Sequence, residues 1–375
     1  GMDKNTLLSS FGKWVSPIFS KRFYQEVASS DQDKYVKKLT TPAYLLLFLH
    51  AQLQQREGLR AIADDVLGTK FQRELGFTSI SASQLSRKHQ QMSTQLLQHV
   101  FMELVQRIRL CSMPSKWKRD FRIIDSTTIP LCVETYKWAT FRETKAGVKL
   151  HFQLAFVSPE DVYPETVQMT TARSHDRTQL GKLVDQSGIT YVFDRGFNDY
   201  AKFDEYCEQG IFFVTRAKKN ASIQYLYDRS IPENSAITRD CFVEMGTMQK
   251  RMRHLLRLVE SMDLEGNPLV LITNRWDLSA EEIGDMYRSR WAIEIFFKWL
   301  KQHVKITSFY GKRKEAVLNQ VFVALIAYCL LVLAKIYSNS KGSLLQIYRW
   351  LRATLWDDCE TWLNLLASKQ KEPYT

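Results

Sequence analysis

Apolar residues at helical spacing dominate the first third of the chain. Residues 44–49 read Tyr-Leu-Leu-Leu-Phe-Leu, and residues 96–108 repeat Leu, Val, Phe and Ile at intervals of three and four. Alternation typical of strands is scarce before residue 119. The pattern therefore predicts an all-α N-terminal domain over residues 1–118.

Two segments of this region resemble a helix-turn-helix pair. Residues 58–66 would form the first helix, and residues 79–92 the second, which presents Arg87 and Lys88 among short polar side chains. Such side chains reach phosphates and base edges in a DNA groove. A capped surface helix explains the same residues equally well, so both interpretations stay open.

Strand patterns begin after a basic loop at residues 115–119. Strands are expected over residues 121–131, 148–157, 162–172, 189–194 and 211–220, with helices over 178–185 and 199–209. The last of these strands runs out into basic residues. Three strands, a helix, a strand, a helix and a strand is the order of an RNase H-like mixed sheet flanked by helices, an α/β (α+β) fold.

The remaining segments complete the domain prediction. Residues 119–220 form the first part of the sheet domain, a β-rich insertion follows over 221–271, and residues 272–340 return to the same domain. Residues 341–375 form a helical tail. The apolar run 321–334 is shorter than the ~20 residues of a membrane span, so a buried core helix is expected there.

One long helix from Ser279 to Lys305 organises the second part. Ser279 and Glu282 have the spacing of a capping box, and neither Pro nor Gly occurs between Gly284 and Gly311. At about 100° per residue, one stripe of this helix carries a single carboxylate among cations and aromatic rings, with Trp291 and Lys298 close beside it. The stripe consists of Tyr287, Arg290, Glu294 and Lys301. An exposed charged face over core aromatics is the simpler interpretation of the stripe alone.

Charge favours a polyanionic partner. The 375 residues carry a net charge of +12, and residues 1–120 hold 18 basic against 10 acidic side chains. The six cysteines show neither CxxC pairs nor zinc-ligand spacing, which is typical of reduced thiols in a cytoplasmic protein. No signal peptide or membrane segment is expected.

Three carboxylates stand in different predicted elements. Asp125 lies on the first strand, Asp194 ends the fourth, and Glu294 lies on the long helix, at separations of 69 and 100 residues. Two-metal phosphoryl transfer needs carboxylates that only folding brings together in this way. Each aspartate alone is explained more simply as a turn or helix cap.

The spacing Tyr287-x2-Arg290-x3-Glu294-x6-Lys301 resembles the Tyr-Arg-Glu-Lys signature of DDE transposases of the insertion-sequence four family. The run Asp194-Arg195-Gly196-Phe197 resembles their DRG-aromatic motif, with Phe197 where Tyr is common. The similarity runs from about residue 40 to residue 340, and the tail is less clearly covered.

This resemblance implies catalytic, metal-binding roles for Asp125, Asp194 and Glu294, with two Mg²⁺ ions that Mn²⁺ can replace. It implies phosphate contacts for Tyr287, Arg290 and Lys301. The implied activity is cleavage at the terminal inverted repeats of a mobile element and transfer of the 3′-hydroxyl into target DNA, often through hairpin ends. The implied partners are double-stranded DNA and a second copy of the chain, at the nucleoid of a bacterial cytoplasm.

Further side chains near this signature have two interpretations each. Trp291 or Trp276 would stack on a base flipped out of the duplex, or would pack in the core. Arg195 would reach the DNA backbone, as would Lys298, or would pair with a neighbouring acid. Two alternatives to an active transposase also stay open: a transposase-derived DNA-binding protein without catalysis, and an RNase H-like nuclease without strand transfer.

A rival acidic site, His175 and Asp176, lies in sequence between Asp125 and Asp194. We interpret Asp176 as a helix cap, because it lies where the next helix is expected to begin. Asp176→Ala should therefore leave measurable DNA cleavage, whereas Asp194→Ala should abolish it. A gel assay of end cleavage compares the two, and equal loss in both variants would contradict the assignment of Asp194 over Asp176.

Overall fold

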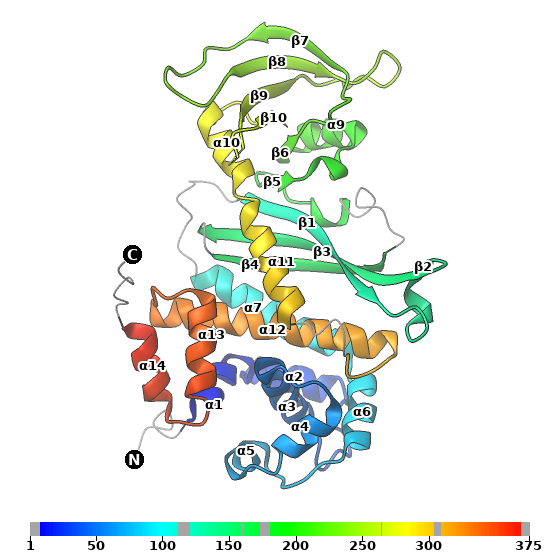
Figure 1. Cartoon of the computed structure of the whole chain (residues 1–375), viewed down its shortest axis with the longest axis vertical. Helices are drawn as coiled ribbons and strands as arrows, with labels where there is room; N and C mark the ends of the chain where they lie inside the picture. Colours follow the sequence, from blue (N-terminus) through cyan, green and yellow to red (C-terminus); the bar gives the residue numbers. More distant parts are fainter. Residues whose placement is uncertain are drawn as a thin grey trace. The chain divides into compact units, whose positions relative to one another are not determined.

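A computed structural model describes residues 8–111, 121–158, 161–172, 181–263, 265–303 and 309–368. The chain divides into two compact units (Figure 1). A helical unit combines Gly1–Ser112, Leu131–Trp138 and Lys298–Thr375, and a sheet unit combines Met113–Pro130 and Ala139–Phe297. The N-terminal helices and the C-terminal helices, which the sequence suggested as separate parts, thus belong to one unit.

The sheet unit is built on one mixed sheet. Its described strands run in the order β2-β3-β1-β5-β6-β10-β9-β8-β7, and β4 pairs antiparallel with β3 outside this order. The bounds are β1 (Phe121–Leu131), β2 (Thr140–Arg142), β3 (Lys145–Ser158), β4 (Asp161–Thr171), β5 (Thr190–Phe193), β6 (Phe212–Arg216), β7 (Ile223–Asp228), β8 (Arg239–Met245), β9 (Leu256–Met262) and β10 (Pro268–Thr273).

The first five predicted strands correspond to β1, β3, β4, β5 and β6, and their spatial order β4-β3-β1-β5-β6 is that of the expected RNase H-like sheet. Strand β5 is parallel to both β1 and β6. Its four residues are all buried, as expected of a parallel strand covered on both faces. The fold-class prediction is confirmed.

Helix α9 (Tyr200–Gln209) packs on the centre of this sheet. Phe203 of the helix stacks on Phe213 of β6 at 4.2 Å between ring centroids, and Phe193 of β5 lies 5.9 Å from Phe203. The short helix η4 (Arg195–Phe197) connects β5 to α9 and buries Phe197 in the same cluster. These aromatic contacts fix the chain that immediately follows Asp194.

Strands β7 to β10, which form the expected insertion, extend the same sheet, because β10 pairs antiparallel with β6. A buried ion pair crosses this extension: Arg257 Nη2 lies 2.8 Å from Asp240 Oδ2. Arg257 Nη1 also donates to the carbonyl oxygens of Arg275 and Leu278. The loop that starts the next helix is therefore held from within the sheet unit.

The capping box at that helix is confirmed. The Ser279 hydroxyl accepts from the Glu282 amide, and the Glu282 carboxylate accepts from the Ser279 amide, at 3.1 Å each. The prediction of one continuous helix from Ser279 to Lys305 is wrong. The segment forms α10 (Ala280–Arg288) and α11 (Trp291–His303), and residues 304 and 305 lie outside the described ranges.

The break at Ser289 has a local cause that needs neither Pro nor Gly. The Ser289 hydroxyl donates to the Asp285 carbonyl at 2.9 Å, a bond that competes with the helical ladder and bends helices. The amides of Arg290 and Ile293 then bond three residues back, as in a 3₁₀ turn. The turn reorients Arg290 relative to α10.

The helical unit surrounds one apolar helix, α12 (Lys314–Ser338), which contacts α3, α6 and α7. It is long and apolar enough to cross a membrane, but 94% of its most apolar window is buried inside the protein. The predicted core helix is thus confirmed.

The other described helices of the unit are α1 (Ser10–Val15), η2 (Ser16–Ile18), α2 (Lys21–Ser29), α3 (Thr41–Gln54), α4 (Leu59–Asp65), α5 (Thr69–Leu75), α6 (Ala82–Gln91), α7 (Thr94–Cys111), η3 (Lys137–Ala139, which ends in the sheet unit), α13 (Leu344–Ala353) and α14 (Cys359–Ala367).

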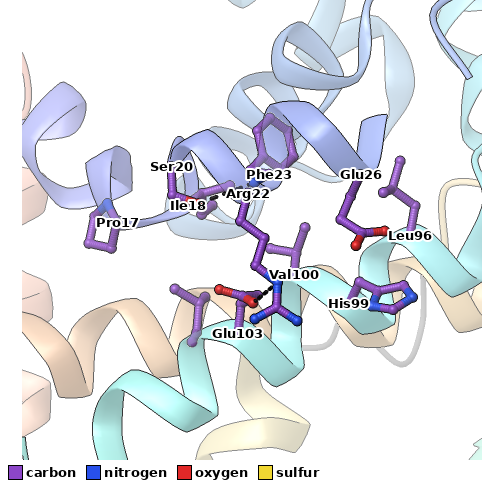
Figure 2. A pocket seen from close by; sticks show the side chains of 11 residues that line it. Pro17, Ile18, Ser20, Arg22, Phe23, Glu26, Leu96, His99, Val100 and Glu103 are labelled. Carbon is purple, nitrogen blue, oxygen red and sulfur yellow. Dashed lines mark hydrogen bonds and ion pairs between the residues drawn. The ribbon is translucent and has the colours of Figure 1, made fainter. Parts of the chain in front are cut away.

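Helix α2 meets α7 around a small gap (Figure 2). Phe23 and Val100 line it, and an ion pair closes one side, with Arg22 Nε 2.8 Å from Glu103 Oε1. Its volume of about 20 Å³ is room for one water molecule. The gap is therefore a packing feature of the α2–α7 contact.

The two ends of the described chain pair with each other in this unit. The amides of Ser10 and Phe11 donate to the carbonyl oxygens of Asp357 and Leu355 at 2.9 Å each, and the Cys359 amide donates to the Leu8 carbonyl. Residues about 350 positions apart in sequence are thus joined by backbone hydrogen bonds.

Asn319 ties α12 to the turn between α6 and α7. Its Nδ2 donates to the carbonyl oxygens of His89 (2.9 Å) and Met92 (3.0 Å), and its Oδ1 accepts from the Thr94 hydroxyl at 2.7 Å. The side chain is fully buried.

Asn319→Ala should lower the free energy of unfolding by about 3 kcal/mol, because it leaves buried carbonyl groups without donors. Urea denaturation measures the loss. Gln98→Ala, an exposed amide on α7, is the matched control and should change stability by less than about 0.5 kcal/mol. A loss in Asn319→Ala no larger than in the control would contradict this role.

Candidate active site

Parallel pairing of β1 and β5 brings two of the predicted carboxylates side by side. Ile124 of β1 is the register partner of Phe193 of β5, so Asp125 and Asp194 follow at the same level. Adjacent strands lie about 4.8 Å apart. The side chains are 21% and 43% exposed, respectively, so both face a partly open site. The Ser126 amide donates to Asp125 Oδ1 at 2.8 Å and orients it.

The guanidinium of Arg290 lies between the two aspartates. Arg290 Nη2 is 3.0 Å from Asp125 Oδ2, and Nη1 is 3.9 Å from Asp194 Oδ1. The same Nη1 donates to the Tyr287 hydroxyl at 3.3 Å. The break at Ser289 places this arginine directly before α11. Two signature residues and two aspartates thus meet in one cluster.

Burial governs the electrostatics of this cluster. It raises the pKa of Asp125 above its ordinary value; nearby Asp194 adds to the rise, and Arg290 and the Ser126 amide oppose it. Burial likewise raises the pKa of Tyr287, which is 6% exposed. For Arg290 burial acts downward, but Tyr287 and the two aspartates raise its pKa overall. Arg290 therefore stays charged beside the two carboxylates.

Glu294 lies one helical turn beyond Arg290, on the first turn of α11, and its side chain is exposed. Within the described ranges, no three His, Cys, Asp or Glu side chains come close enough together to hold a metal ion. The structure thus brings together Asp125 and Asp194, and leaves Glu294 outside their immediate cluster.

The donor set still suits a divalent metal. Carboxylate oxygens are the ligands that Mg²⁺ and Mn²⁺ prefer. The space between Asp125 and Asp194 already accommodates a cationic group, the Arg290 guanidinium, in contact with the first and within 3.9 Å of the second. We conclude that these residues fit a cation at this position.

The other predicted site residues have varied settings. Lys298 and Lys301 are exposed on later turns of α11, in the helical unit, and Trp291 is half-buried at its start. Arg195 is half-buried in η4. Trp276 stacks on Phe242 at 4.7 Å, with the Arg229 guanidinium 5.8 Å from its ring, so it packs within the sheet unit.

The helix-turn-helix segment is more complex than expected. Helix α5 lies between α4 and α6 in sequence, and α4 contacts α6. Arg87 is exposed on α6. Lys88 is only 8% exposed, and its ammonium group lies 3.8 Å from Asp33. Lys88 thus supports the fold of the helical unit, whereas the spacing had suggested a DNA contact.

Arg216 is a neighbour of the site that the sequence did not single out. It ends β6 one residue after Thr215, the partner of Phe193, and so lies level with Asp194. Its charge lowers the pKa of Tyr287 against the effect of burial. The only sequence signal for Arg216 was the basic run at the end of that strand.

The rival acidic site predicted at His175 and Asp176 lies outside the described residues.

Comparison with known proteins agrees with this geometry. A family model described as "Transposase DDE domain" matches residues 116–330 and so contains both aspartates, Arg290 and Glu294. The chain belongs to the DDE transposase family. A second model, a domain of unknown function (DUF4372), matches residues 6–78 of this transposase.

Similar proteins carry the same assignment in their names. A protein of Geobacillus stearothermophilus, named as a transposase for insertion sequence element IS5377, is 31% identical over 334 residues, which are 88% of this chain and 85% of the relative. A protein of Sinorhizobium fredii named as a transposase is 34% identical over 57% of this chain and 60% of its own length. A solved structure titled as a piggyBac transposase synaptic complex with hairpin DNA aligns over 96% of this chain and 80% of its own, with 12% identity and a TM-score of 0.44.

The chain is therefore an insertion-sequence transposase of the type that the Tyr-Arg-Glu-Lys signature suggested, and an enzyme. Enzymes of the DDE class depend on divalent metal ions. The carboxylates of Asp125 and Asp194, level with each other on β1 and after β5, are the kind of ligand that such ions prefer.

The raised pKa of Asp125 can be measured directly. Carboxyl ¹³C NMR of the metal-free transposase should show Asp125 titrating above the ordinary value, and Arg290→Gln should raise its pKa further by removing the opposing charge. Because the folded pKa of Asp125 is raised, its ionisation costs folding free energy above that pKa; the cost shrinks as pH falls through the folded pKa and is gone below the unfolded pKa.

Asp204 is the internal control. Burial raises its pKa, but hydrogen bonds from Arg253 and His254 outweigh burial, so it should titrate below the ordinary value and should not respond to Arg290→Gln. An Asp125 titration at or below that of Asp204 would contradict the electrostatics described above.

Proposed function

We propose that this transposase cleaves DNA at the terminal inverted repeats of its own element with two Mg²⁺ ions, which Mn²⁺ can replace. The freed 3′-hydroxyl then joins target DNA, so the element moves by cut-and-paste, with hairpin ends as an intermediate. Two copies of the chain hold the two ends. The place of action follows from the substrate: chromosomal DNA in the bacterial cytoplasm.

The observation that carries the proposal is the shared contact of Asp125 and Asp194 with one cationic group. Two carboxylates at the same level of adjacent parallel strands repel each other unless positive charge lies between them. Asp125, Asp194 and Glu294 would hold the metal ions. When bound, such ions activate the attacking oxygen and stabilise the leaving oxygen of the phosphoryl transfer.

Arg290 has two alternative partners in this scheme. Without DNA its guanidinium neutralises the aspartates, at 3.0 Å from Asp125. Carboxylate and phosphate both match the planar fork of a guanidinium. On DNA binding Arg290 transfers to the phosphate next to the cleaved bond, and leaves the carboxylates to the metal ions. Tyr287, bonded to Arg290 Nη1, orients it during this exchange.

Other side chains hold the DNA. Lys298 and Lys301 are exposed cations on α11, and they contact the phosphate backbone together with Arg195. Trp291 at the start of α11 is the ring that stacks on a displaced base, because Trp276 is already stacked on Phe242. Helices of the N-terminal region, with Arg87, bind the terminal repeat.

A cleavage assay on a duplex that carries the element's own end, taken from the DNA flanking the gene, tests this function. With Mg²⁺ the wild type should release 3′-hydroxyl ends and join them to a plasmid. Glu294→Gln and Asp194→Asn should each slow cleavage by at least about a hundredfold, because each removes charge from the metal site. Glu281→Gln, an exposed acid on α10, is the charge-matched control and should cleave normally.

Two outcomes would replace the proposal. If the wild type binds the end but never cuts it, the chain is a DNA-binding protein descended from a transposase. If it cuts the end but never joins a pre-cut 3′ end to a plasmid, it is a nuclease without strand transfer.

A further inference from the structure

Three adjacent parallel strands, β1, β5 and β6, carry charged residues at one level of the sheet. The register places Asp194 after β5 level with Arg216 of β6, just as Asp125 lies level with Asp194. Strands lie about 4.8 Å apart, so these three positions form a row of roughly 10 Å. The chain leaving β6 continues from this row into Lys218 and Lys219, both exposed.

A cavity of about 550 Å³ opens beside this exit. Its walls come from three segments that all belong to the sheet unit: residues 198–201, which begin four positions after Asp194, Lys218 after β6, and residues 250–252 between β8 and β9. Lys218, Lys250 and Arg251 contribute three cationic side chains. We call this feature the Lys218–Lys250 cavity.

The carboxylates in the cavity are committed to other groups. Asp199 caps α9 by accepting from the Lys202 amide at 3.3 Å. Asp204 accepts from the amides of Arg253 and His254 and from His254 Nδ1 at 2.8 Å. Across the described part of the chain, Lys218 and Lys250 form no ion pair, while Arg251 Nε lies 3.8 Å from Glu244. Two ammonium groups are thus left for an external anion.

The turn that carries Lys250 is held in one conformation. Gly246 has φ of +104°, and a Cβ there would lie 2.1 Å from the Lys250 carbonyl oxygen. The Lys250 amide donates to the Thr247 carbonyl at 3.1 Å, and the Met252 amide donates to the Met245 carbonyl. Lys250 is therefore displayed from a fixed turn, which lowers the entropy lost on binding.

We propose that the Lys218–Lys250 cavity binds the phosphodiester backbone of DNA beside the cleaved bond. This inference rests on the proposed function, because it takes Asp125 and Asp194 to mark the position of that bond. A DNA strand places one phosphate about every 3.4 Å along its axis, so the cavity meets phosphates a few nucleotides from the scissile one. Cations from two separate loops suit an extended polyanion.

Salt-dependent binding of the double variant Lys218→Ala/Lys250→Ala by the full-length protein tests the inference. Both side chains are exposed, so the variant should fold. At physiological salt it should bind DNA about tenfold more weakly, and the slope of log K against log [salt] should shrink by about 2, since each lost phosphate contact removes about 0.9. Lys218→Arg/Lys250→Arg keeps both charges and should retain the slope.

Three duplexes identify the DNA segment that is bound: an element end with its flank, a pre-cut end without flank, and an unrelated target. If the double variant binds only the flanked end more weakly than the wild type does, the cavity contacts flanking DNA. If it binds only the unrelated duplex more weakly, the cavity contacts target DNA. Weakening on all three assigns it to backbone that every complex shares. Unchanged affinity and slope on all three duplexes would overturn the inference.

The failure of the proposed function gives a different result from the failure of this inference. Absent cleavage by the wild type, with the salt slope still reduced in the double variant, contradicts the function and keeps the cavity as a DNA site. Normal cleavage by the wild type, with no change in affinity or slope in the double variant, contradicts the cavity alone.

Discussion

The like-charge repulsion between Asp125 and Asp194 is the constraint on which this structure depends. Parallel pairing of β1 and β5 forces the two carboxylates to the same level on neighbouring strands. Burial of Asp125 makes that arrangement more costly. The protein offsets the cost with the Arg290 guanidinium, which is delivered by a different element, so sheet and helix have to be assembled correctly for the site to be stable.

That delivery explains several features of the sheet unit. The buried Arg257–Asp240 pair holds the loop before α10, the capping box starts α10 at Ser279, and the break at Ser289 ends it. Each of these contacts acts on the same short path toward Arg290. The extension of the sheet by β7 to β10 is thus part of the frame of the active site, since it contains the arginine that fixes the loop.

The sequence was sufficient for the elements whose pattern is set by local chemistry. β-branched and apolar runs predicted β1, β3, β4, β5 and β6 in their correct order, and the capping box marked the start of α10. It also singled out Asp125, Asp194 and Arg290 as candidate site residues. The helix break was missed because a serine hydroxyl bonding back along a helix leaves no trace in periodicity. The sequence left a DNA contact open for Lys88, because nothing in its own segment indicates that Asp33, 55 residues earlier, is its partner.

The pairing of residues 8–11 with residues 355–359 bears on the order in which the chain matures during synthesis. In sequence, every strand of the sheet unit precedes the last segment of the helical unit, so all the described strands leave the ribosome before α12, α13 and α14 are synthesised. Vectorial synthesis lets a segment fold only against what has already emerged. The N-terminal helices therefore cannot complete their packing until the C-terminal helices have been synthesised. The sheet unit, which carries the two aspartates, is fully synthesised first, although the helical unit begins earlier in the chain.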